Sequence, residues 1–263
     1  MAHVGSASPG RRFVCHVAQE GLSEREVRRM INASCETDFL YRGLRALVGF
    51  RSQTALAWLR HGHFVRARAI RAYLDAHPDG KLHLGSTNAL PGFLNSQIMG
   101  AVPIDVIRPL PLPDKSFVLI YSSHLVEHLH RLQFFDFLAE SRRVLKPGGL
   151  HLIATPSAEK IARTLYGSDS PEKSVLLEAG ARFYPERFHT PAHQLNLTMR
   201  AYGHRFLYDL AFMREAGRAA GFASVDSIDN FELPDAHLTE YVRSRKSKRW
   251  YVETETFVFC VPG

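Results

Sequence analysis

The pattern of apolar and polar positions changes near residue 80. Over residues 23–77 apolar residues recur at spacings of three and four, as in FVRARAIRAYLDAH at Phe64–His77, and this spacing predicts amphipathic helices. Ser23 and Glu26 have the spacing of a capping box, which predicts a helix start. Pro78-Asp79-Gly80 predicts the end of the last helix. We therefore expect residues 1–78 to form a helical N-terminal extension.

After residue 80 short apolar runs alternate with helical segments. Strands are predicted at LHLG (82–85), GFLNSQI (92–98), PIDVI (103–107), SFVLIYSS (116–123), GLHLIATP (149–156), ASVDSIDNF (223–231) and ETFVFCVP (255–262). Between these strands, apolar residues at helical spacing predict one helix that ends before Pro147-Gly148-Gly149 and another that ends before Gly221. This alternation is typical of a parallel sheet that helices cover on both faces. The last strand should be antiparallel, because it follows the strand before it too closely for a helical crossover.

One long segment fits neither pattern. Residues 157–205 are rich in Pro and His and show weak periodicity. Long segments of this kind often form lids or binding loops. We expect a lid or substrate segment here, within a domain that spans residues 79–263.

Composition fits a soluble globular protein, with 45% hydrophobic and 22% charged residues in 263. No run approaches the ~20 apolar residues of a membrane span, and the N-terminus has no convincing secretion signal. Three scattered cysteines without a CxxC pair indicate reduced thiols, so we expect a cytoplasmic protein. The net charge is +7, but only RSRKSKR at Arg243–Arg249 is densely basic. A nucleic-acid or phosphate-rich partner is therefore not favoured over a solubilising loop.

Four segments, in order along the chain, resemble one known family. They are LHLGSTNALPGFLNSQ (82–97), IDVIRPLPLPDKSFVLIYSSHLVEHL (104–129), ESRRVLKPGGLHLIATP (140–156) and YGHRFLYDLAFMREAGRAAGF (202–222). The chain is similar here to class I S-adenosylmethionine-dependent methyltransferases, and within them to a bacterial branch associated with polysaccharide and secondary-metabolite gene clusters. The resemblance implies an α/β, Rossmann-like fold with a mostly parallel seven-stranded sheet and an antiparallel last strand. It also implies S-adenosylmethionine as the cofactor.

The resemblance assigns a cofactor site at the carboxyl ends of the strands. Gly85 and Ser86 lie in the turn whose backbone amides would face the methionine carboxylate. Asp105, with Val106 beside it, has the position that accepts a hydrogen bond from the adenine amino group. Ser122 ends the fourth strand at the same edge.

Three residues depart from the family pattern. Gln97 stands where the family has an acid for the ribose hydroxyls, and Thr87 replaces the second glycine of the turn. Val118 stands where Asp is common. Because neutral hydrogen-bond acceptors bind less strongly than charged ones, we expect Gln97 and Thr87 to weaken cofactor binding without abolishing it.

The first candidate for catalysis is His124. It ends the fourth strand, next to the place of the methyl group in this family, and a base is needed if the acceptor is a hydroxyl or a protonated amine. His128 is expected to be a hydrogen-bonding residue at a helix start. His189, His193 and Tyr208 are weaker candidates for substrate contacts.

Two other readings of the motifs are not favoured. HLVEH at His124–His128 matches a zinc-peptidase motif, but that chemistry needs both histidines on one helical face, and His124 falls at a strand end. A nicotinamide dehydrogenase would share the fold, but GxGxxG is absent. No metal is therefore expected.

The sequence leads to a methyltransferase that acts on O or N of a small-molecule or glycan-type acceptor, in secondary metabolism or polysaccharide biosynthesis. Two alternatives stay open: a catalytically degenerate binding or scaffold protein, and an enzyme that uses S-adenosylmethionine for other chemistry. A homo-oligomer is compatible with the sequence, which does not fix the oligomeric state.

Overall fold

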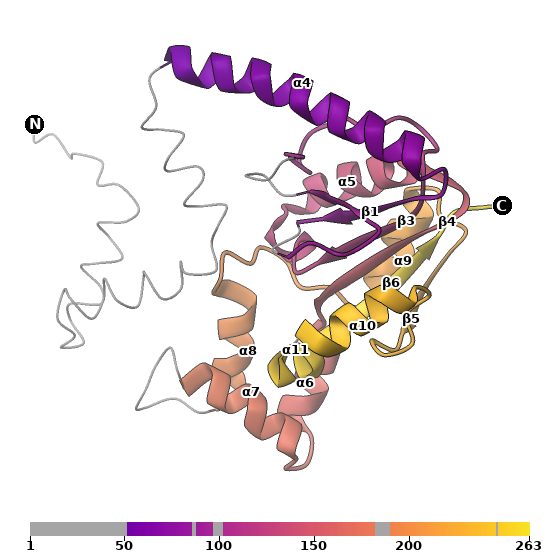
Figure 1. Cartoon of the computed structure of the whole chain (residues 1–263). Helices are drawn as coiled ribbons and strands as arrows, with labels where there is room; N and C mark the ends of the chain where they lie inside the picture. Colours follow the sequence, from indigo (N-terminus) through magenta and orange to yellow (C-terminus); the bar gives the residue numbers. More distant parts are fainter. Residues whose placement is uncertain (1–51, 86–87, 97–101, 182–189, 246) are drawn as a thin grey trace, which may run out of the picture.

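The computed structural model describes residues 52–85, 88–96, 102–181, 190–245 and 247–263 (Figure 1). In chain order the elements are α4 (Ser52–Ala76), β1 (Gly80–Leu84), β2 (Leu94–Ser96), β3 (Phe117–Ser123), the 3-10 turn η2 (Val126–His128), α5 (Arg131–Val144), β4 (Leu145–Pro156), α6 (Ala158–Tyr166), α7 (Pro171–Ala181), α8 (Pro191–Arg200), α9 (Leu210–Ala219), β5 (Ser224–Ile228), α10 (Ala236–Arg245), α11 (Lys248–Glu253) and β6 (Thr254–Cys260). Among these described helices, none is long and apolar enough to cross a membrane.

The strands form one mixed sheet in the order β2-β1-β3-β4-β6-β5. The pairs β1–β2, β1–β3 and β3–β4 are parallel. β6 lies between β4 and β5 and is antiparallel to both. The expected α/β, Rossmann-like sheet with an antiparallel last strand is confirmed.

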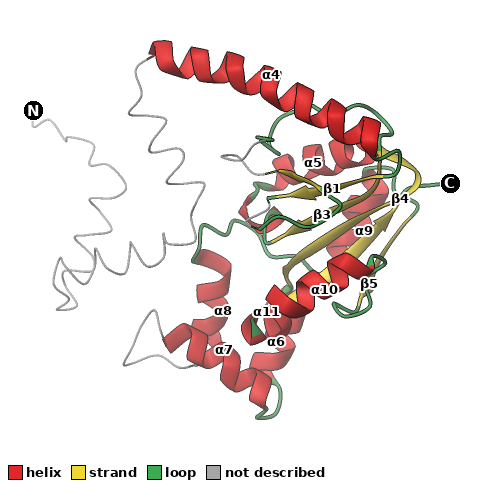
Figure 2. Ribbon diagram, viewed as in Figure 1, coloured by secondary structure: helices red, strands yellow, loops and turns green. Residues whose placement is uncertain are grey.

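Helices cover both faces of the sheet (Figure 2). On one face a large apolar cluster joins the strands to α4, α5 and α9 through Ile70, Phe134, Phe137 and Met213. On the other face a second cluster joins them to α10 and α11 through Leu238, Tyr241, Val242 and Trp250. Because both faces are covered, the central strands are apolar on both sides: in β3, Phe117 and Ile120 are buried in the first cluster, and Leu119 and Tyr121 in the second.

The described sheet has six strands, so the expectation of seven is wrong for this part of the chain. The run PIDVI at 103–107 is not a strand but enters a turn. Oδ1 of Asp105 accepts a hydrogen bond from the backbone N–H of Ile107 at 3.2 Å, and its carbonyl accepts one from Arg108 at 3.3 Å. An Asp side chain that bonds the backbone two residues ahead favours a turn over a strand.

The direction expected for the last strand is right, but the reason for it is wrong. Two helices, α10 and α11, lie between β5 and β6. They bring the chain back to the carboxyl ends of the parallel strands, where Thr254 pairs with Pro156. β6 therefore starts where β4 ends, and must run in the opposite direction.

The structure describes only part of the expected N-terminal extension (1–78) and of the expected lid or substrate segment (157–205). α4 is helical as expected and carries Ile70 into the core, whereas residues 1–51 lie outside the described residues. Within 157–205 the described residues form α6, α7 and α8, beyond the strand ends in Figure 1. Ile161, Leu165 and Leu176 form a small cluster of their own there.

Arg143 of α5 fixes the loop that leads into β3. Its guanidinium donates to the carbonyls of Leu110 and Leu112, both at 2.9 Å, and to Glu140 at 2.8 Å. Glu140 in turn accepts the backbone N–H of Leu110 at 2.6 Å. Arg143 holds the pKa of the Glu140 carboxyl below its usual value. One ion pair therefore satisfies three backbone groups of a loop with no ladder partners.

Replacing Arg143 with Met should lower the free energy of unfolding by about 1–3 kcal/mol, because the carbonyl of Leu112 loses its donor and Glu140 its counter-charge. The carbonyl of Leu110 keeps the N–H of Leu112 as a donor. Urea denaturation measures this loss. Arg142→Met is the matched control: Arg142 donates only to the carbonyl of Gly221, at 3.1 Å, so its loss should be under about 1 kcal/mol. Equal losses in the two variants would contradict the role given to Arg143.

A second prediction concerns His151, which is fully buried in β4. Burial lowers the pKa of His151 to about 3, so the native state holds it neutral. The unfolded chain takes up a proton near pH 6.5 and the native chain does not, so stability is complete above that pH and falls as pH drops toward 3. Between pH 6.5 and 4 the loss from this residue should approach about 3 kcal/mol.

Denaturant unfolding of wild type and His151→Gln over this pH range tests the point. His151→Gln should lower stability at neutral pH but flatten its decline in acid. His237→Gln, at an exposed histidine of α10, should leave the decline unchanged. A wild-type slope in His151→Gln would refute the assignment.

Candidate functional site

The site is located by the sheet order. From β1 the chain moves outward to β2 and then returns past β1 to β3 on the other side. In open α/β sheets, ligands bind at the carboxyl ends of the strands where the chain direction reverses in this way. In this protein that place lies between the ends of β1 and β3, which are Leu84 and Ser123.

Gly85 makes the turn that opens this edge. Its φ of +70° is left-handed, a conformation that favours glycine. A Cβ there would approach Cδ1 of Leu125 to 3.3 Å, so the turn after β1 lies against the turn after β3. Ser86, Thr87 and Gln97, the other residues expected at the methionine and ribose ends, lie outside the described residues.

Asp105 and Val106 lie in the turn that replaces the expected strand. Oδ2 of Asp105 is 3.3 Å from Nε of Arg108, which is largely exposed, while Oδ1 accepts from Ile107 as described above. Asp105 and Val106 are half-buried. The turn thus holds a carboxylate at the surface, where its remaining lone pairs can accept a bond from a ligand amine.

Ser122 is turned away from the edge. Its hydroxyl is 3.3 Å from Nε2 of His151 in the buried layer between sheet and helix, and the residue is 1% exposed. Any part it takes in binding would therefore involve its backbone. The sequence places Ser122 at the strand end correctly, but period-two alternation alone does not tell which face its hydroxyl joins.

His124 is the residue at which the chain turns after β3. It has a left-handed φ of 51°, a conformation that costs a residue with a Cβ about 1–2 kcal/mol and that is often found at functional sites. Its N–H still donates to the carbonyl of Ala154 at 2.8 Å. The ring lies between Oγ1 of Thr254, 2.8 Å from Nε2, and Oε1 of Glu127, 3.3 Å from Nδ1.

Glu127 is the residue that the sequence analysis missed. Its side chain is fully buried, and burial raises its pKa to about 8, although a hydrogen bond from Thr155 at 3.1 Å opposes the rise. Glu253 of α11 is close enough to add to that effect, and burial raises its pKa as well. Strongly shifted carboxyls at a sheet edge are typical of functional sites. The signal available in the sequence was a charged Glu within an otherwise apolar run.

Two histidines complete this group. His128 of η2 and His204 stack edge to face, with ring centroids 5.0 Å apart. Burial lowers the pKa of His204 to about 4, and the charge of His128 contributes to the shift. Arg249 lies behind them, bonded to Glu253 and to the hydroxyl of Tyr202, both at 2.9 Å.

The remaining candidate residues are bonded within the fold, lie outside this group of side chains, or lie outside the described residues. Tyr208 is buried, and its hydroxyl donates to the carbonyl of Val126 at 3.1 Å. His193 is half-buried in α8, and His189 lies outside the described residues. In the basic cluster, Arg243 donates to the carbonyl of Phe231, so Arg243 and Arg249 are both used within the chain.

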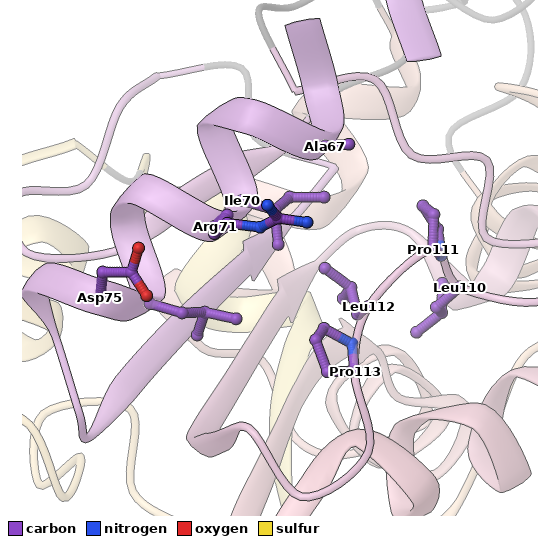
Figure 3. A pocket seen from close by; sticks show the side chains of 9 residues that line it. Ala67, Ile70, Arg71, Asp75, Leu110, Pro111, Leu112 and Pro113 are labelled. Carbon is purple, nitrogen blue, oxygen red and sulfur yellow. The ribbon is translucent and has the colours of Figure 1, made fainter. Parts of the chain in front are cut away.

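A hollow of about 460 Å³ lies apart from this edge. It is lined by α4 and by Leu110–Pro113 (Figure 3). These segments lead into the amino ends of β1 and β3, whereas Gly85 and His124 follow the carboxyl ends. The candidate site is therefore assigned to the edge with the buried acid, the strained histidine and the topological switch.

The described residues fit S-adenosylmethionine. The left-handed turn at Gly85 can bring backbone amides toward a carboxylate, and Asp105 offers a carboxylate oxygen at the surface. The ligand's aminocarboxylate needs fewer donors than a pyrophosphate, so a single glycine in the described part of the turn is adequate.

Comparison with known proteins gives one family match. A family described as "Methyltransferase domain" matches residues 95–153, from β2 to β4. No curated protein sequence matches significantly.

Two similar solved structures are methyltransferases. Phosphoethanolamine N-methyltransferase 2 of Haemonchus contortus, in complex with S-adenosyl-L-methionine, is 15% identical over 74% of this chain and 52% of that chain, with a TM-score of 0.37. A SAM-dependent methyltransferase from Archaeoglobus fulgidus is 15% identical over 80% of this chain and 100% of that chain, with a TM-score of 0.40. The chain thus spans about half the length of the Haemonchus enzyme.

The family match covers β3 and most of β4 but not β1, the other strand at the topological switch. Residues 95–153 therefore match the methyltransferase-domain family, whose methyl donor is S-adenosylmethionine.

Proposed function

We propose that the protein transfers a methyl group to an oxygen or nitrogen of a small-molecule or glycan-type acceptor, in secondary metabolism or polysaccharide biosynthesis. The observation that carries this proposal is the position of His124. A titratable ring with a left-handed backbone lies beside the turn of Gly85, at the strand ends where the methyl donor binds in this fold. A hydroxyl or protonated-amine acceptor needs a base, and His124 can provide one.

S-adenosylmethionine supplies an electrophilic methyl group bonded to a positively charged sulfur. Amides after Gly85 would hold its carboxylate, Gln97 a ribose hydroxyl, and Asp105 the adenine amine. Fixing both ends in this way places the methyl group near His124, and alignment of this kind accounts for much of the rate in bimolecular displacements.

His124 would take the acceptor's proton at Nε2. An acceptor hydroxyl would replace that of Thr254 as the partner of Nε2, while Glu127 faces Nδ1 on the other side of the ring. Burial raises the pKa of Glu127 to about 8, and a positive charge that forms on the nearby ring would favour its ionised form. The ionised carboxylate would then stabilise the imidazolium. The proton ends on His124, and the acceptor lone pair forms the new bond to carbon as the carbon–sulfur bond breaks.

Segments that flank this edge would shape the acceptor site. α8 and the residues after it lie near η2, since the N–H groups of Arg205 and Phe206 donate to the carbonyl of Glu127 at 2.7 and 3.3 Å. Trp250 of α11 lies 6.2 Å from the His124 ring. Aromatic and polar side chains around one histidine suit a hydroxylated, partly apolar acceptor.

Calorimetry with S-adenosylmethionine tests the cofactor site. Asp105→Ala should weaken binding by at least about tenfold, because it removes a charged hydrogen-bond acceptor. Gln97→Asp should tighten binding roughly fivefold to tenfold, because a carboxylate binds ribose hydroxyls more strongly than an amide.

The control for these two variants is Asp226→Ala. Asp226 of β5 forms an exposed ion pair with Arg214 of α9. Removing the Asp226 carboxylate should therefore leave the affinity for S-adenosylmethionine unchanged. If wild type and Gln97→Asp both fail to bind at millimolar ligand, the scaffold alternative is supported and the proposed activity is rejected.

Turnover tests the role of His124, measured as S-adenosylhomocysteine released with hydroxyl- or amine-bearing sugars and small molecules as acceptors. His124→Asn should lower kcat by about 100-fold or more, with little change in cofactor affinity. Asn is chosen over Ala because it tolerates the left-handed backbone at this position.

Thr254→Val provides the comparison. It removes the hydroxyl partner of Nε2 but leaves the base, so kcat should fall far less than in His124→Asn. An unchanged kcat in His124→Asn, with an acceptor that wild type methylates, would make His124 a structural residue.

A further inference from the structure

Glu127, His128 and His204 bring three metal-binding side chains together. One ligand atom from each lies within 4.8 Å of the other two. Glu127 and His128 are neighbours in η2, whereas His204 follows α8. Ligands about 2.0–2.2 Å from one tetrahedral ion are about 3.3–3.6 Å apart, so side-chain movements on the order of 1 Å would let all three reach a common ion.

The backbone holds this arrangement in place. The N–H groups of Arg205 and Phe206 both donate to the carbonyl of Glu127, which fixes the segment of His204 against η2. The rigid connection means that the three side chains meet because of the fold, and not because of surface rotamers.

His204 is oriented as a ligand. Its Nδ1 lies 2.6 Å from the carbonyl of Thr198, and because a carbonyl only accepts, Nδ1 must carry the proton. The lone pair is then on Nε2. Metal-binding histidines are commonly fixed in this way, by donating the second ring nitrogen to a carbonyl or carboxylate.

A second observation, separate from the distances between the three side chains, also indicates a ligand: a buried oxygen of Glu127 has no hydrogen-bond partner in the described part of the chain. The residue is 0% exposed, and Oε1 makes no hydrogen bond within the described part of the chain, while Oε2 accepts one from Thr155. Oε1 lies 3.3 Å from Nδ1 of His124 without a hydrogen bond of acceptable geometry. A buried carboxyl oxygen without a partner is unfavourable, and a bound cation would both pair with Oε1 and stabilise the ionised form of the group.

We propose that Glu127, His128 and His204 bind a divalent transition-metal ion at the carboxyl edge of the sheet, beside His124. Two imidazoles and one carboxylate suit zinc, cobalt or manganese better than magnesium or calcium, which prefer oxygen ligands throughout. The positive charge of Arg249, which acts on His204, is compensated by Glu253 at 2.9 Å. Such a site differs from the peptidase motif considered above, since its third ligand is His204 and not His124.

Three protein ligands leave coordination positions open, as in catalytic metal sites. This role rests on the proposed function: an open position next to His124 would take the acceptor's oxygen and lower the pKa of the acceptor's hydroxyl. Metal binding itself does not depend on that role.

The test is titration of chelator-treated, full-length protein with Co²⁺, followed by the visible absorption of the bound ion, and competition with Zn²⁺. Because the chain has 14 histidines, the result that matters is the difference between variants. Wild type should bind one equivalent more tightly than any background. Glu127→Gln, His128→Gln and His204→Gln should each weaken that equivalent by more than about 100-fold, since even changes outside the ligand set cost ~10–100-fold.

His130→Gln is the matched control. His130 is an exposed histidine close by, and its ring faces Arg205, so the tight equivalent should persist in this variant. Melting temperature checks folding: without metal, Glu127→Gln should melt no lower than wild type, because it removes a buried ionisable group. With Zn²⁺, wild type and His130→Gln should show a rise in Tm that the three ligand variants lack.

Wild-type cobalt stoichiometry and spectrum in folded Glu127→Gln and His204→Gln would overturn the site, as would the absence of a tight equivalent in wild type. Cofactor calorimetry separates this outcome from failure of the proposed function. Protein that binds cobalt but not S-adenosylmethionine would retain the metal site and reject the methyltransferase. Protein that binds S-adenosylmethionine but not cobalt would reject the metal site and leave the proposed methyltransferase function standing.

Discussion

The reversal of the chain at His124 is the constraint on which the candidate site depends. β3 is the strand that pairs with both β1 and β4, so its end lies at the topological switch. His124 keeps a ladder bond to Ala154 while its left-handed φ turns the chain sharply into η2. A strand that continued would carry Glu127 out into solvent; the reversal instead buries it under the sheet edge and brings His128 toward His204.

Buried polarity at this edge has a cost that the rest of the fold must offset. Glu127 and Glu253 are both buried and their pKa values are raised, and a left-handed histidine adds strain. The large apolar clusters on both faces of the sheet supply the stability that makes such a site tolerable. Polar groups that weaken a fold and are nevertheless well positioned are most simply explained by function.

The segments that resemble the methyltransferase family divide into structural and chemical parts. In ESRRVLKPGG the acid and the second arginine, Glu140 and Arg143, tie down the loop before β3 and touch no part of the candidate site. In SSHLVEH, by contrast, His124, Glu127 and His128 all lie at the sheet edge. A motif shared with a family can therefore mark a clamp as readily as a ligand, and only the contacts distinguish the two.

The sequence by itself determined the elements whose pattern is local. Period-two and near-continuous apolar runs gave β1, β3, β4 and β6, and spacing of three and four gave α5 and α9, because each such element buries its apolar face wherever it lies. It also placed Gly85 and His124 at strand ends. It failed at Pro103–Ile107, where the Asp105 side chain favours a turn, and between β5 and β6, where α10 and α11 show little periodicity.

Only the tertiary structure decided which chemical groups meet. Glu127 and His204 are distant in sequence, and nothing in either segment specifies that the N–H groups of Arg205 and Phe206, which follow His204, donate to the carbonyl of Glu127. The inward face of Ser122, the proton on Nδ1 of His204 and the unpartnered oxygen of Glu127 likewise depend on neighbours from other elements. Periodicity records how one element meets the core, whereas a site is defined by contacts between elements, and these exist only once the chain has folded.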